Sequence, residues 1–448
     1  MRLTATKKWL PLLALTLLIF EASYAVAQAG TLDTTFGSNG IVSTALRELN
    51  AVAIQSDGKI VLAGLGVANN QVADTLVRLN TDGSLDTTFG SDGVANLVPT
   101  GVLAANGFFA MAIQSNGEIV GATATTSDAG VNFVQVARVE ANGSLDTSFG
   151  SGGFTATTAI PFTPGDSSDA REISLGLQSN GAILVATSYS NLMARFTSSG
   201  QLDTSFGSGG IINLSNTGPG ITSGPTQIAV EKNGRILVAS GSLAPNPQLQ
   251  AGTITRYNTN GSVDTTFGAL GTAASVASAS ALVLQSNGKI VVAGALTSKV
   301  NAPPAVSDLG FGVIVYNSNG MIEKTFGSGG VAVADFGSNA PVSGAFAIAI
   351  QSSGDLVAGG AASQGTANAS FNSAFGLARF TSVGVLDSSF GTGGLVTTTI
   401  VSGSSNVYSY VDGLAIQSDG KIVAAGNTIV DQGHGSGSGS YVARYLAQ

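Results

Sequence analysis

The chain has 448 residues and a formal net charge of −8, and only 10% of its residues are charged, against about 25% in ordinary domains. This weak, acidic charge argues against a nucleic-acid-binding protein, because such proteins need a basic surface. Cysteine is absent, which excludes disulfides, thiolate metal sites and cysteine nucleophiles. The 61 glycines are typical of a turn-rich β protein.

The first predicted element is a secretory signal peptide over residues 1–29. It begins with three basic residues, continues with an apolar stretch too short to span a bilayer comfortably, and ends in small residues. The tripeptides that start at Ala25 and Ala27 both match an A-x-A cleavage signal. We therefore expect a secreted or periplasmic protein with no membrane span after cleavage. An uncleaved N-terminal anchor is the alternative.

A short phrase, Leu-Asp-Thr-Thr-Phe-Gly, then organises the chain in seven copies. We call each copy a box. Two copies are identical, at 32–37 and 85–90. The box phenylalanines are separated by 53 to 64 residues and are Phe36, Phe89, Phe149, Phe206, Phe267, Phe326 and Phe390. A period of this size indicates a repeat architecture, in which each unit buries its apolar face against its neighbours.

A second phrase predicts a β-hairpin in every unit. Ala-Ile-Gln-Ser-Asp-Gly-Lys-Ile occupies 53–60, and its counterparts, all without insertion, occupy 112–119, 176–183, 229–236, 283–290, 349–356 and 415–422. An Asn-Gly, Asp-Gly or Ser-Gly pair at its centre supplies the positive φ angles of a tight turn. The strand that follows the turn is continuously apolar, which indicates burial on both faces.

A third phrase predicts a second hairpin, whose two strands are the arginine segment and the box. The distance from the arginine to the box phenylalanine is always 11 residues; the residues at the arginine position are Arg78, Arg138, Arg195, Arg256, Val315, Arg379 and, at the last unit, Arg444. The connections between hairpins vary in length instead. Because alternate loops of an antiparallel meander lie at the same end, we expect all tight turns on one face and all variable loops on the other.

Seven units of four strands predict an all-β, seven-bladed β-propeller that occupies residues 30–448 as one domain. The last unit stops at Gln448 without its box, whereas the first box stands alone at the N-terminus. Joining Gln448 directly to Gly30 would place Phe36 11 residues after Arg444, the internal spacing. We therefore expect the N-terminal strand to pair with the C-terminal blade and close the ring, and the signal peptide to be cleaved after Ala29.

These phrases carry a resemblance to a known family. The segments 54–60 and 85–90 resemble the delta-60 repeat family of exported bacterial proteins and, more loosely, NHL propeller repeats. The resemblance implies a β-propeller and implies no catalytic residue. The chain departs from the repeat pattern at Glu231, Val315 and Glu323.

The arginine and the box aspartate are always eight residues apart, which predicts an ion pair across the second hairpin. The expected pairs are Arg78 with Asp86, Arg138 with Asp146, Arg195 with Asp203, Arg256 with Asp264, and Arg379 with Asp387. A ring of ligand-binding charges is the functional alternative. One aspartate per box does not make a calcium loop, so we expect no metal and no cofactor.

The residue after the first turn glycine varies in sign and is expected to be a solvated tip; it is Lys59, Glu118, Ala182, Arg235, Lys289, Asp355 or Lys421. The single histidine, His434, lies in a glycine-rich stretch that offers no fixed geometry for catalysis. No catalytic, cofactor-binding or metal residue is therefore assigned.

We predict an exported, non-catalytic propeller that acts as a monomeric binding module for a glycan or protein partner. Its ligand is expected on the variable-loop face, where the longest connections run over 295–310 and 361–376 and where the aromatic candidates are Phe162, Phe371, Tyr408 and Tyr410. The first alternative is a hydrolase or lyase that uses loop carboxylates, for which the candidates are Asp166, Asp169, Glu172, Asp308 and Asp335. The second alternative is a structural envelope protein.

Overall fold

A computed structural model gives the fold. It describes residues 28–98, 102–127, 130–155, 160–162, 173–188, 190–214, 225–240, 252–275, 279–296, 310–337, 343–363, 372–401, 407–431 and 436–447. Within these ranges the regular structure is all β. Every internal gap falls in a connection of variable length, so the signal peptide, His434, Phe371 and four of the five loop acids lie outside the described residues.

Five sheets have four antiparallel strands each. Sheet one contains β2 (Glu48–Ile54), β3 (Ile60–Ala68), β4 (Gln71–Leu79) and β5 (Val94–Leu97). Sheet two contains β6 (Val102–Ile113), β7 (Ile119–Ser127), β8 (Asn132–Val139) and β9 (Pro161–Phe162). Sheet three contains β10 (Ile173–Leu177), β11 (Ile183–Thr187), β12 (Leu192–Phe196) and β13 (Ile211–Asn213). Sheet four contains β14 (Pro225–Val230), β15 (Ile236–Ser240), β16 (Thr253–Tyr257) and β17 (Thr272–Ala274). Sheet five contains β18 (Ala281–Leu284), β19 (Ile290–Ala295), β20 (Phe311–Tyr316) and β21 (Val331–Ala334).

The remaining eight strands form one sheet made of two antiparallel sets. Set six contains β22 (Gly344–Ile350), β23 (Leu356–Ser363), β24 (Ser373–Phe380) and β25 (Leu395–Thr398). Set seven contains β26 (Val407–Ile416), β27 (Ile422–Asp431), β28 (Ser436–Tyr445) and β1 (Ile41–Ser43). A single parallel pair, Ser373 with Tyr408, joins the two sets. The predicted pairing of the N-terminal strand with the last set is present, because Ile41 of β1 faces Ala443 of β28.

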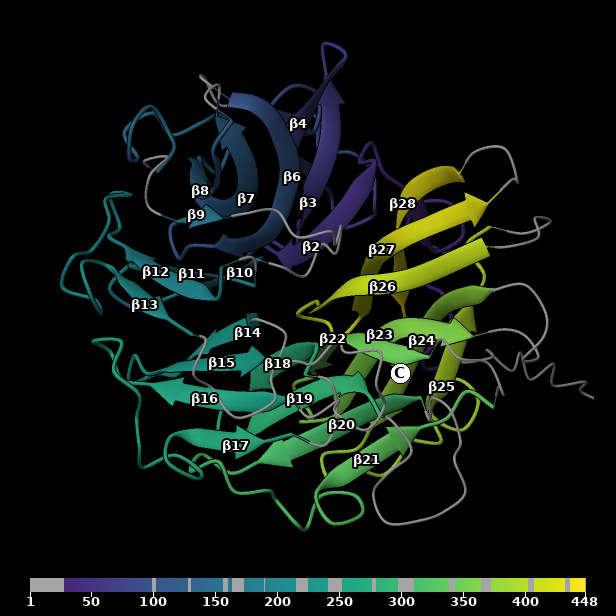
Figure 1. The fold of residues 1–448 in the computed structure, drawn as a ribbon. Helices are drawn as coiled ribbons and strands as arrows, with labels where there is room; N and C mark the ends of the chain where they lie inside the picture. The colour runs from purple at the N-terminus through teal and green to yellow at the C-terminus, as the bar shows by residue number, and fades with distance from the viewer. Residues whose placement is uncertain are drawn as a thin grey trace, which may run out of the picture.

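The five sheets and two sets follow one another around the molecule in chain order (Figure 1). The first strands of successive sheets, β2, β6, β10, β14, β18, β22 and β26, contact one another in turn, and β26 also contacts β2. Seven hydrophobic clusters fill the spaces, each built from two neighbouring sheets or sets. One of them packs Leu49 and Val77 of sheet one against Val423 and Val442 of set seven. The continuous apolar strand of each unit is therefore buried on both faces.

The box does not form the fourth strand of its unit, contrary to the sequence prediction. In the first complete unit Leu85 makes only an isolated bridge to Leu79, and the fourth strand, β5, starts at Val94. Between them the N–H of Phe89 donates to the carbonyl of Asp86 and the N–H of Gly93 donates to the carbonyl of Phe89. The chain turns here instead of extending, because two glycines of positive φ interrupt it, Gly90 (57°) and Gly93 (92°).

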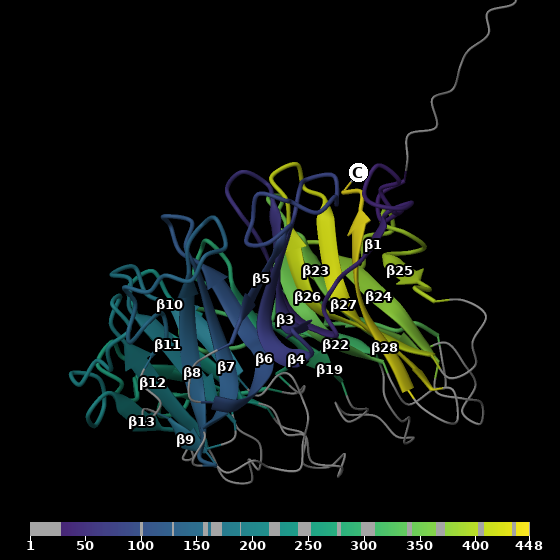
Figure 2. The ribbon, with the colours of Figure 1, turned by 90° about the horizontal axis from the view of Figure 1, so that it is seen from above.

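The tight turns of the two hairpins lie together at one end of the sheets. A Cβ atom built on Gly58, in the first turn, would stand 3.0 Å from Cγ2 of Thr81, in the second. Figure 2 places this end along its upper edge, where β28 and the C-terminus also point. The expectation that the tight turns lie on one face is therefore confirmed, and we call this face the constant face. The described residues include no helix that is long and apolar enough to cross a membrane.

Candidate functional site

The first strands of several units carry a β-bulge at the same place. The register shifts in β2, β14, β22 and β26, and it shifts more than once in β6. The bulged residues each stand five positions before the glutamine position of the first hairpin; they are Asn50, Phe109, Thr226, Phe346 and Asp412. A bulge adds one unpaired residue and re-aims its side chain. The first strands of the units, which we call the central strands, therefore carry different side chains at one equivalent position.

Four of these residues line a common cavity. It has a volume of about 130 Å³, and its wall includes Asn50, Phe109, Phe346 and Asp412. Gln227 of β14 and residues of β10 complete the wall, so most of the central strands contribute to it. Cavities that hold a whole drug-sized ligand measure roughly 300–1,000 Å³. This cavity therefore suits one arm of a ligand and not a complete sugar ring.

The cavity wall offers polar atoms. The side-chain amide of Asn50 donates to the carbonyl of Phe108 at 3.0 Å, whereas its buried Oδ1 has no hydrogen-bond partner among the described residues. Asp412 accepts a 2.8 Å hydrogen bond from Nδ2 of Asn427. A buried acceptor without a partner costs free energy unless a ligand or water donates to it. The carbonyl oxygen of Asn50 is thus a ready acceptor for a hydroxyl group.

An aromatic cluster adjoins the cavity. Tyr408 and Tyr410 of β26 have ring centroids 5.0 Å apart, and Phe346 of β22 meets Tyr410 edge-on at 6.1 Å. Because Phe346 also lines the cavity, the cluster and the cavity are continuous. β26 begins directly after a variable connection, so the tyrosines lie toward the variable-loop end of the sheet.

The structure brings together two of the four predicted aromatic residues. Tyr408 and Tyr410 are in contact, Phe162 lies on β9 at the outer edge of sheet two, and Phe371 lies outside the described residues. Phe346 was missed by the sequence analysis. It occupies the same position of its unit as Asp412, and this position, compared across units, is the signal that points to it.

The predicted loop acids do not assemble a site within the described residues. Asp335 is exposed, and its carboxylate accepts the N–H of Gly337 at 2.8 Å, which is a turn-capping role. Elsewhere the structure groups Glu118, Glu140 and Asp146 within 4.8 Å of one another. The guanidinium of Arg138 lies among them, 3.3 Å from Glu118 and bonded to Asp146, so this group already holds a cation.

The five predicted arginine–aspartate pairs are all present, with N–O distances of 2.5–2.8 Å. A sixth pair, Arg444 with Asp33 at 3.0 Å, joins the two ends of the chain. In each pair the arginine carbon Cζ also lies 4.5–4.8 Å from the centre of the box phenylalanine ring. These contacts confirm the predicted ion pairs.

Each of these arginines also ties its unit to the next one. Nη1 of Arg138 donates to the carbonyl of Ser198, in the second hairpin turn of sheet three, at 2.7 Å. Burial alone would raise the pKa of Asp146, but hydrogen bonds from Ser148 and Arg138 outweigh it and hold that pKa below its usual range. The pair is therefore ionised at neutral pH and serves the junction between sheets.

The residue after the first turn glycine is not simply a solvated tip, so that expectation is wrong. Lys59 contacts Asp86 at 2.9 Å, and Lys289 contacts Glu323 at the same distance. Two further cations reach box aspartates at 3.3 Å; they are Arg235 and Lys421. The turn is short and close to the box, so its side chain lies within reach of the box carboxylate.

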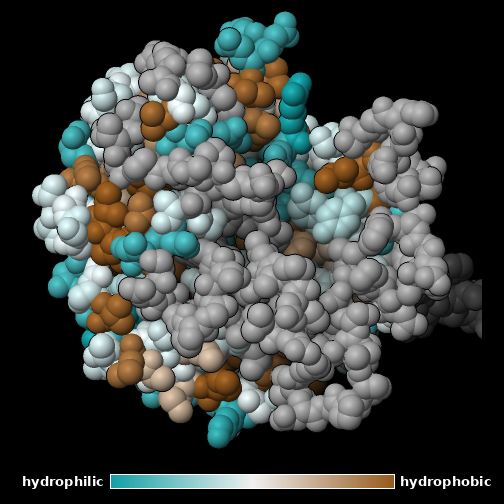
Figure 3. Space-filling model, in the orientation of Figure 1, coloured by the Kyte–Doolittle hydropathy of each residue, from teal (hydrophilic) through white to brown (hydrophobic). Residues whose placement is uncertain are grey.

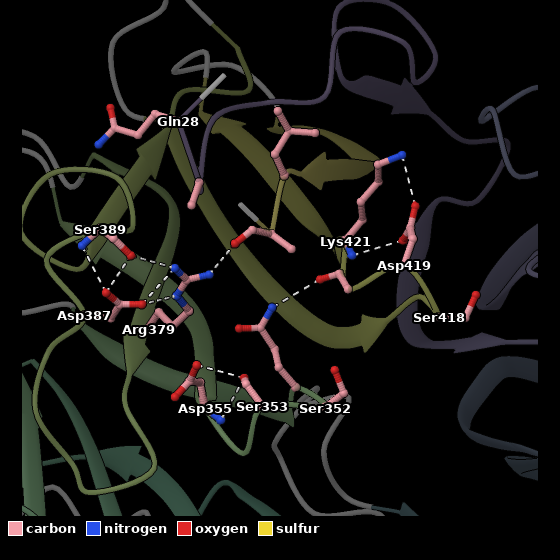
Figure 4. A pocket seen from close by; sticks show the side chains of 15 residues that line it. Gln28, Ser352, Ser353, Asp355, Arg379, Asp387, Ser389, Ser418, Asp419 and Lys421 are labelled. Atoms are coloured by element: carbon pink, nitrogen blue, oxygen red, sulfur yellow. Dashed lines mark hydrogen bonds and ion pairs between the residues drawn. The ribbon is translucent and has the colours of Figure 1, made fainter. Parts of the chain in front are cut away.

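A larger hollow, of about 880 Å³, lies on the constant face where the two chain ends meet (Figure 4). Its wall includes Gln28 and Ala447. The charged groups drawn there already have partners: Arg379 contacts Asp387 at 2.8 Å and Lys421 contacts Asp419 at 3.1 Å. We therefore place the candidate ligand site at the central cavity and not in this hollow.

A comparison with protein families identifies a match to segments of this chain. The family described as "Domain of unknown function (DUF5122) beta-propeller" matches residues 55–89, 114–149, 178–206, 231–267, 351–390 and 417–448. Each matched segment starts at or near the glutamine position of a unit, and this supports a β-propeller repeat family. The unit of Val315 and Glu323 lies between matched segments. No curated protein matches the chain.

Solved structures resemble this fold at low identity. A streptogramin B lyase is 13% identical over 90% of this chain and 96% of its own, with a TM-score of 0.45. A polysaccharide lyase, Uly1, is 11% identical over 96% and 94%, with a TM-score of 0.45. A catalytically inactive virginiamycin B lyase from Staphylococcus aureus, with quinupristin, is 13% identical over 90% and 98%, with a TM-score of 0.42. These likenesses concern the fold alone.

Proposed function

We propose that the chain is an exported, seven-bladed β-propeller of the delta-60 repeat type, closed into a ring as a single domain, that binds a neutral glycan without transforming it. The glycan would lie against Tyr408 and Tyr410 at the variable-loop end of the central cavity and send one hydroxyl-bearing arm toward Asn50 and Asp412. The contact of the tyrosine pair with the cavity residue Phe346 is the observation that carries this proposal.

Contacts between the first and last units support the closed ring. The buried side chain of Asn427 on β27 accepts the N–H of Leu49 on β2 at 2.9 Å and donates to the carbonyl of Leu49 at 2.8 Å. Gln417 donates to the carbonyl of Gly58, and Gln178 and Gln351 donate in the same way to the turn glycine of their own next unit. Set seven therefore meets sheet one with the same kind of contact that joins successive units.

The chemistry of the site favours a neutral sugar. Aromatic rings offer apolar faces to the C–H face of a pyranose, while tyrosine hydroxyls and an amide carbonyl hydrogen-bond its hydroxyl groups. On the face drawn in Figure 3, hydrophilic and hydrophobic groups of the described residues lie side by side.

Export is supported by the first residues, whose basic start, apolar stretch and small residues are typical of a secretory leader. Removal of the leader also simplifies a fluorescence test of binding. The only tryptophan of the chain is Trp9, so the mature protein has none and its emission comes from tyrosine. A sugar that stacks on Tyr408 and Tyr410 should change that emission.

The experiment is a glycan array with the mature protein, followed by fluorescence titration of each glycan bound. We expect Tyr410→Leu to weaken binding by about tenfold or more, since a central aromatic contact is typically worth over 1 kcal/mol. Tyr441→Leu, a change to a tyrosine on β28, is the control and should leave binding unchanged. Absence of glycan binding, or equal losses in both variants, would refute the proposal. Release of shortened or unsaturated sugars would show the hydrolase or lyase instead.

A further inference from the structure

The N–H of every box glycine has an acceptor in a neighbouring unit. In the six boxes from Gly37 to Gly327 the acceptor is a carbonyl of the second hairpin turn of the following unit; the acceptors are those of Asp82, Asn142, Ser199, Asn260, Asn319 and Val383, at 2.8–2.9 Å. In the seventh box, the N–H of Gly391 donates to the carbonyl of Ala29 at 2.8 Å. Ala29 therefore occupies the place of a turn residue.

The second hairpin of the last unit has no continuous turn, because the chain ends at Gln448. Residues just after the leader form that turn together with the C-terminal residues. The N–H of Gly30 donates to the carbonyl of Leu446, and the N–H of Leu446 donates to the carbonyl of Thr31, both at 2.9 Å. The same two bonds close the intact turn of sheet one, from Gly83 to Asn80 and from Asn80 to Ser84. The turn is thus built from two separate chain ends.

Gln28 belongs to this structure as well. Its carbonyl accepts the N–H of Thr31 at 3.1 Å and the hydroxyl of Thr31 at 2.7 Å. Its side-chain amide donates to the carbonyl of Gly391, whose N–H is held by Ala29. Ala29 itself is only 7% exposed and lies in the hydrophobic cluster of Phe390. Removal of residues 28 and 29 would break each of these contacts.

We propose that the exported protein is processed between Ala27 and Gln28, so that Gln28 is the mature N-terminus. This inference rests on the proposed export and replaces the expectation of cleavage after Ala29. Hydrolysis adds water across the Ala27–Gln28 peptide bond and leaves a carboxylate on Ala27 and an ammonium group on Gln28. The Ala25-Val26-Ala27 signal fits this position.

The surroundings of Gln28 leave room for a new N-terminus. Gln28 lines the hollow of about 880 Å³ on the constant face, and the same wall carries Asp355 and Asp419 (Figure 4). The described hydrogen bonds of Asp355 come from Ser353 and from the backbone of Ser382. Because Arg379 and Lys421 of the same wall pair with carboxylates, the new ammonium group would enter a mixed-charge, open hollow and remain in contact with solvent.

The test is the intact mass of the protein recovered from the exported fraction of a bacterial host. We expect the mass of residues 28–448. A product that starts at Gly30, or at any other residue, would overturn the processing site while leaving export intact. Recovery of the uncleaved precursor alone would instead refute the proposed export, so the two failures are distinguishable.

Two leader variants sharpen this test, because the two candidate signals share only one alanine. Ala25→Asp alters the signal that ends at Ala27 and no other. We expect it to lower the processed fraction at least several-fold, with the precursor accumulating. A Ser23→Asp change, two residues upstream of Ala25, is the matched control and should leave processing unchanged. Normal processing of the Ala25→Asp precursor would refute cleavage after Ala27.

Discussion

A single buried carboxyl, that of Asp74, should make the stability of this protein fall as pH rises. Asp74 on β4 is fully buried, and its Oδ1 accepts a 2.9 Å hydrogen bond from the hydroxyl of Thr123 on β7. Its Oδ2 has no partner among the described residues. Burial raises the pKa of Asp74 to about 7, against hydrogen bonds from Thr123 and Gly107 that lower it.

The sign and size of the effect follow from linkage. The unfolded chain ionises Asp74 near its ordinary pKa of 3.8, while the folded chain keeps the proton up to about pH 7. Its contribution to stability is therefore full below pH 3.8 and is lost as pH rises to about 7. Roughly three pKa units at 1.36 kcal/mol each give a loss on the order of 4 kcal/mol.

The assay is urea unfolding of the wild type and Asp74→Asn between pH 4.5 and 8, with matched buffers. The variant cannot ionise at this position, so its advantage over the wild type should grow by several kcal/mol across this range. Asp203→Asn is the control. The hydroxyl of Ser205 leads the contacts that hold the pKa of Asp203 below its usual range, so the loss from that change should be nearly constant above pH 5. Parallel pH profiles for the wild type and Asp74→Asn would refute the reasoning.

Three further outcomes are expected from the contacts between and within units. In a double-mutant cycle of Arg195→Ala and Asp203→Ala, the coupling should be about 0.5–3 kcal/mol, and additive losses would contradict the ion pair. Asn427→Ala should cost about 1–3 kcal/mol in thermal or urea unfolding, because it leaves the buried N–H and carbonyl of Leu49 without their partners, and an unchanged midpoint would contradict this role. Val315→Arg with Glu323→Asp should unfold at a higher midpoint than either single change, since only the pair restores the stacked arginine and its aspartate; no gain over the singles would count against that stacking.

The parts of the fold that sequence could predict are those set by local turn chemistry. A glycine of positive φ at the centre of each hairpin, such as Gly58 or Gly83, fixes the register of its two strands. Once the register is fixed, residues eight apart must face each other, and the pairing of Arg78 with Asp86 follows. The pair of Arg444 with Asp33 was not among the predicted pairs, although the predicted join of the two chain ends gives these residues the same spacing.

This reasoning failed for the box, which does not form the predicted strand. Its fixed spacing after the arginine segment suggested the second strand of a hairpin, but in the first complete unit the glycines Gly90 and Gly93 turn the chain back on itself instead. Positive φ at two nearby residues is incompatible with an extended strand, so the constant spacing reflects a constant turn and not a strand. The phenylalanine of that box, Phe89, is buried all the same, because the turn directs it between the sheets.

The candidate ligand site could not be predicted in full for a different reason. Its residues share a position in the repeat and differ in type, so Asn50, Phe346 and Asp412 carry no common chemical signal. The bulge is coupled to contacts between neighbouring sheets. For example, Asn427 of set seven hydrogen-bonds the backbone of Leu49, the residue before the bulged Asn50. Asp74 is similar, because its burial between sheets one and two is a property of the junction and not of β4 alone.

The unit that lacks the arginine shows which contacts are needed to join neighbouring units and which contacts only add stability. In that unit Val315 cannot reach the next hairpin turn, and Glu323 is held by Lys289 instead. Yet the N–H of Gly327 still donates to the carbonyl of Val383 at 2.8 Å, and Phe326 is still only 3% exposed. The glycine bond and the buried phenylalanine therefore suffice to dock one unit on the next. It follows that the arginine pairs add stability to junctions that already exist, which leaves the opposite, variable face free to differ from unit to unit.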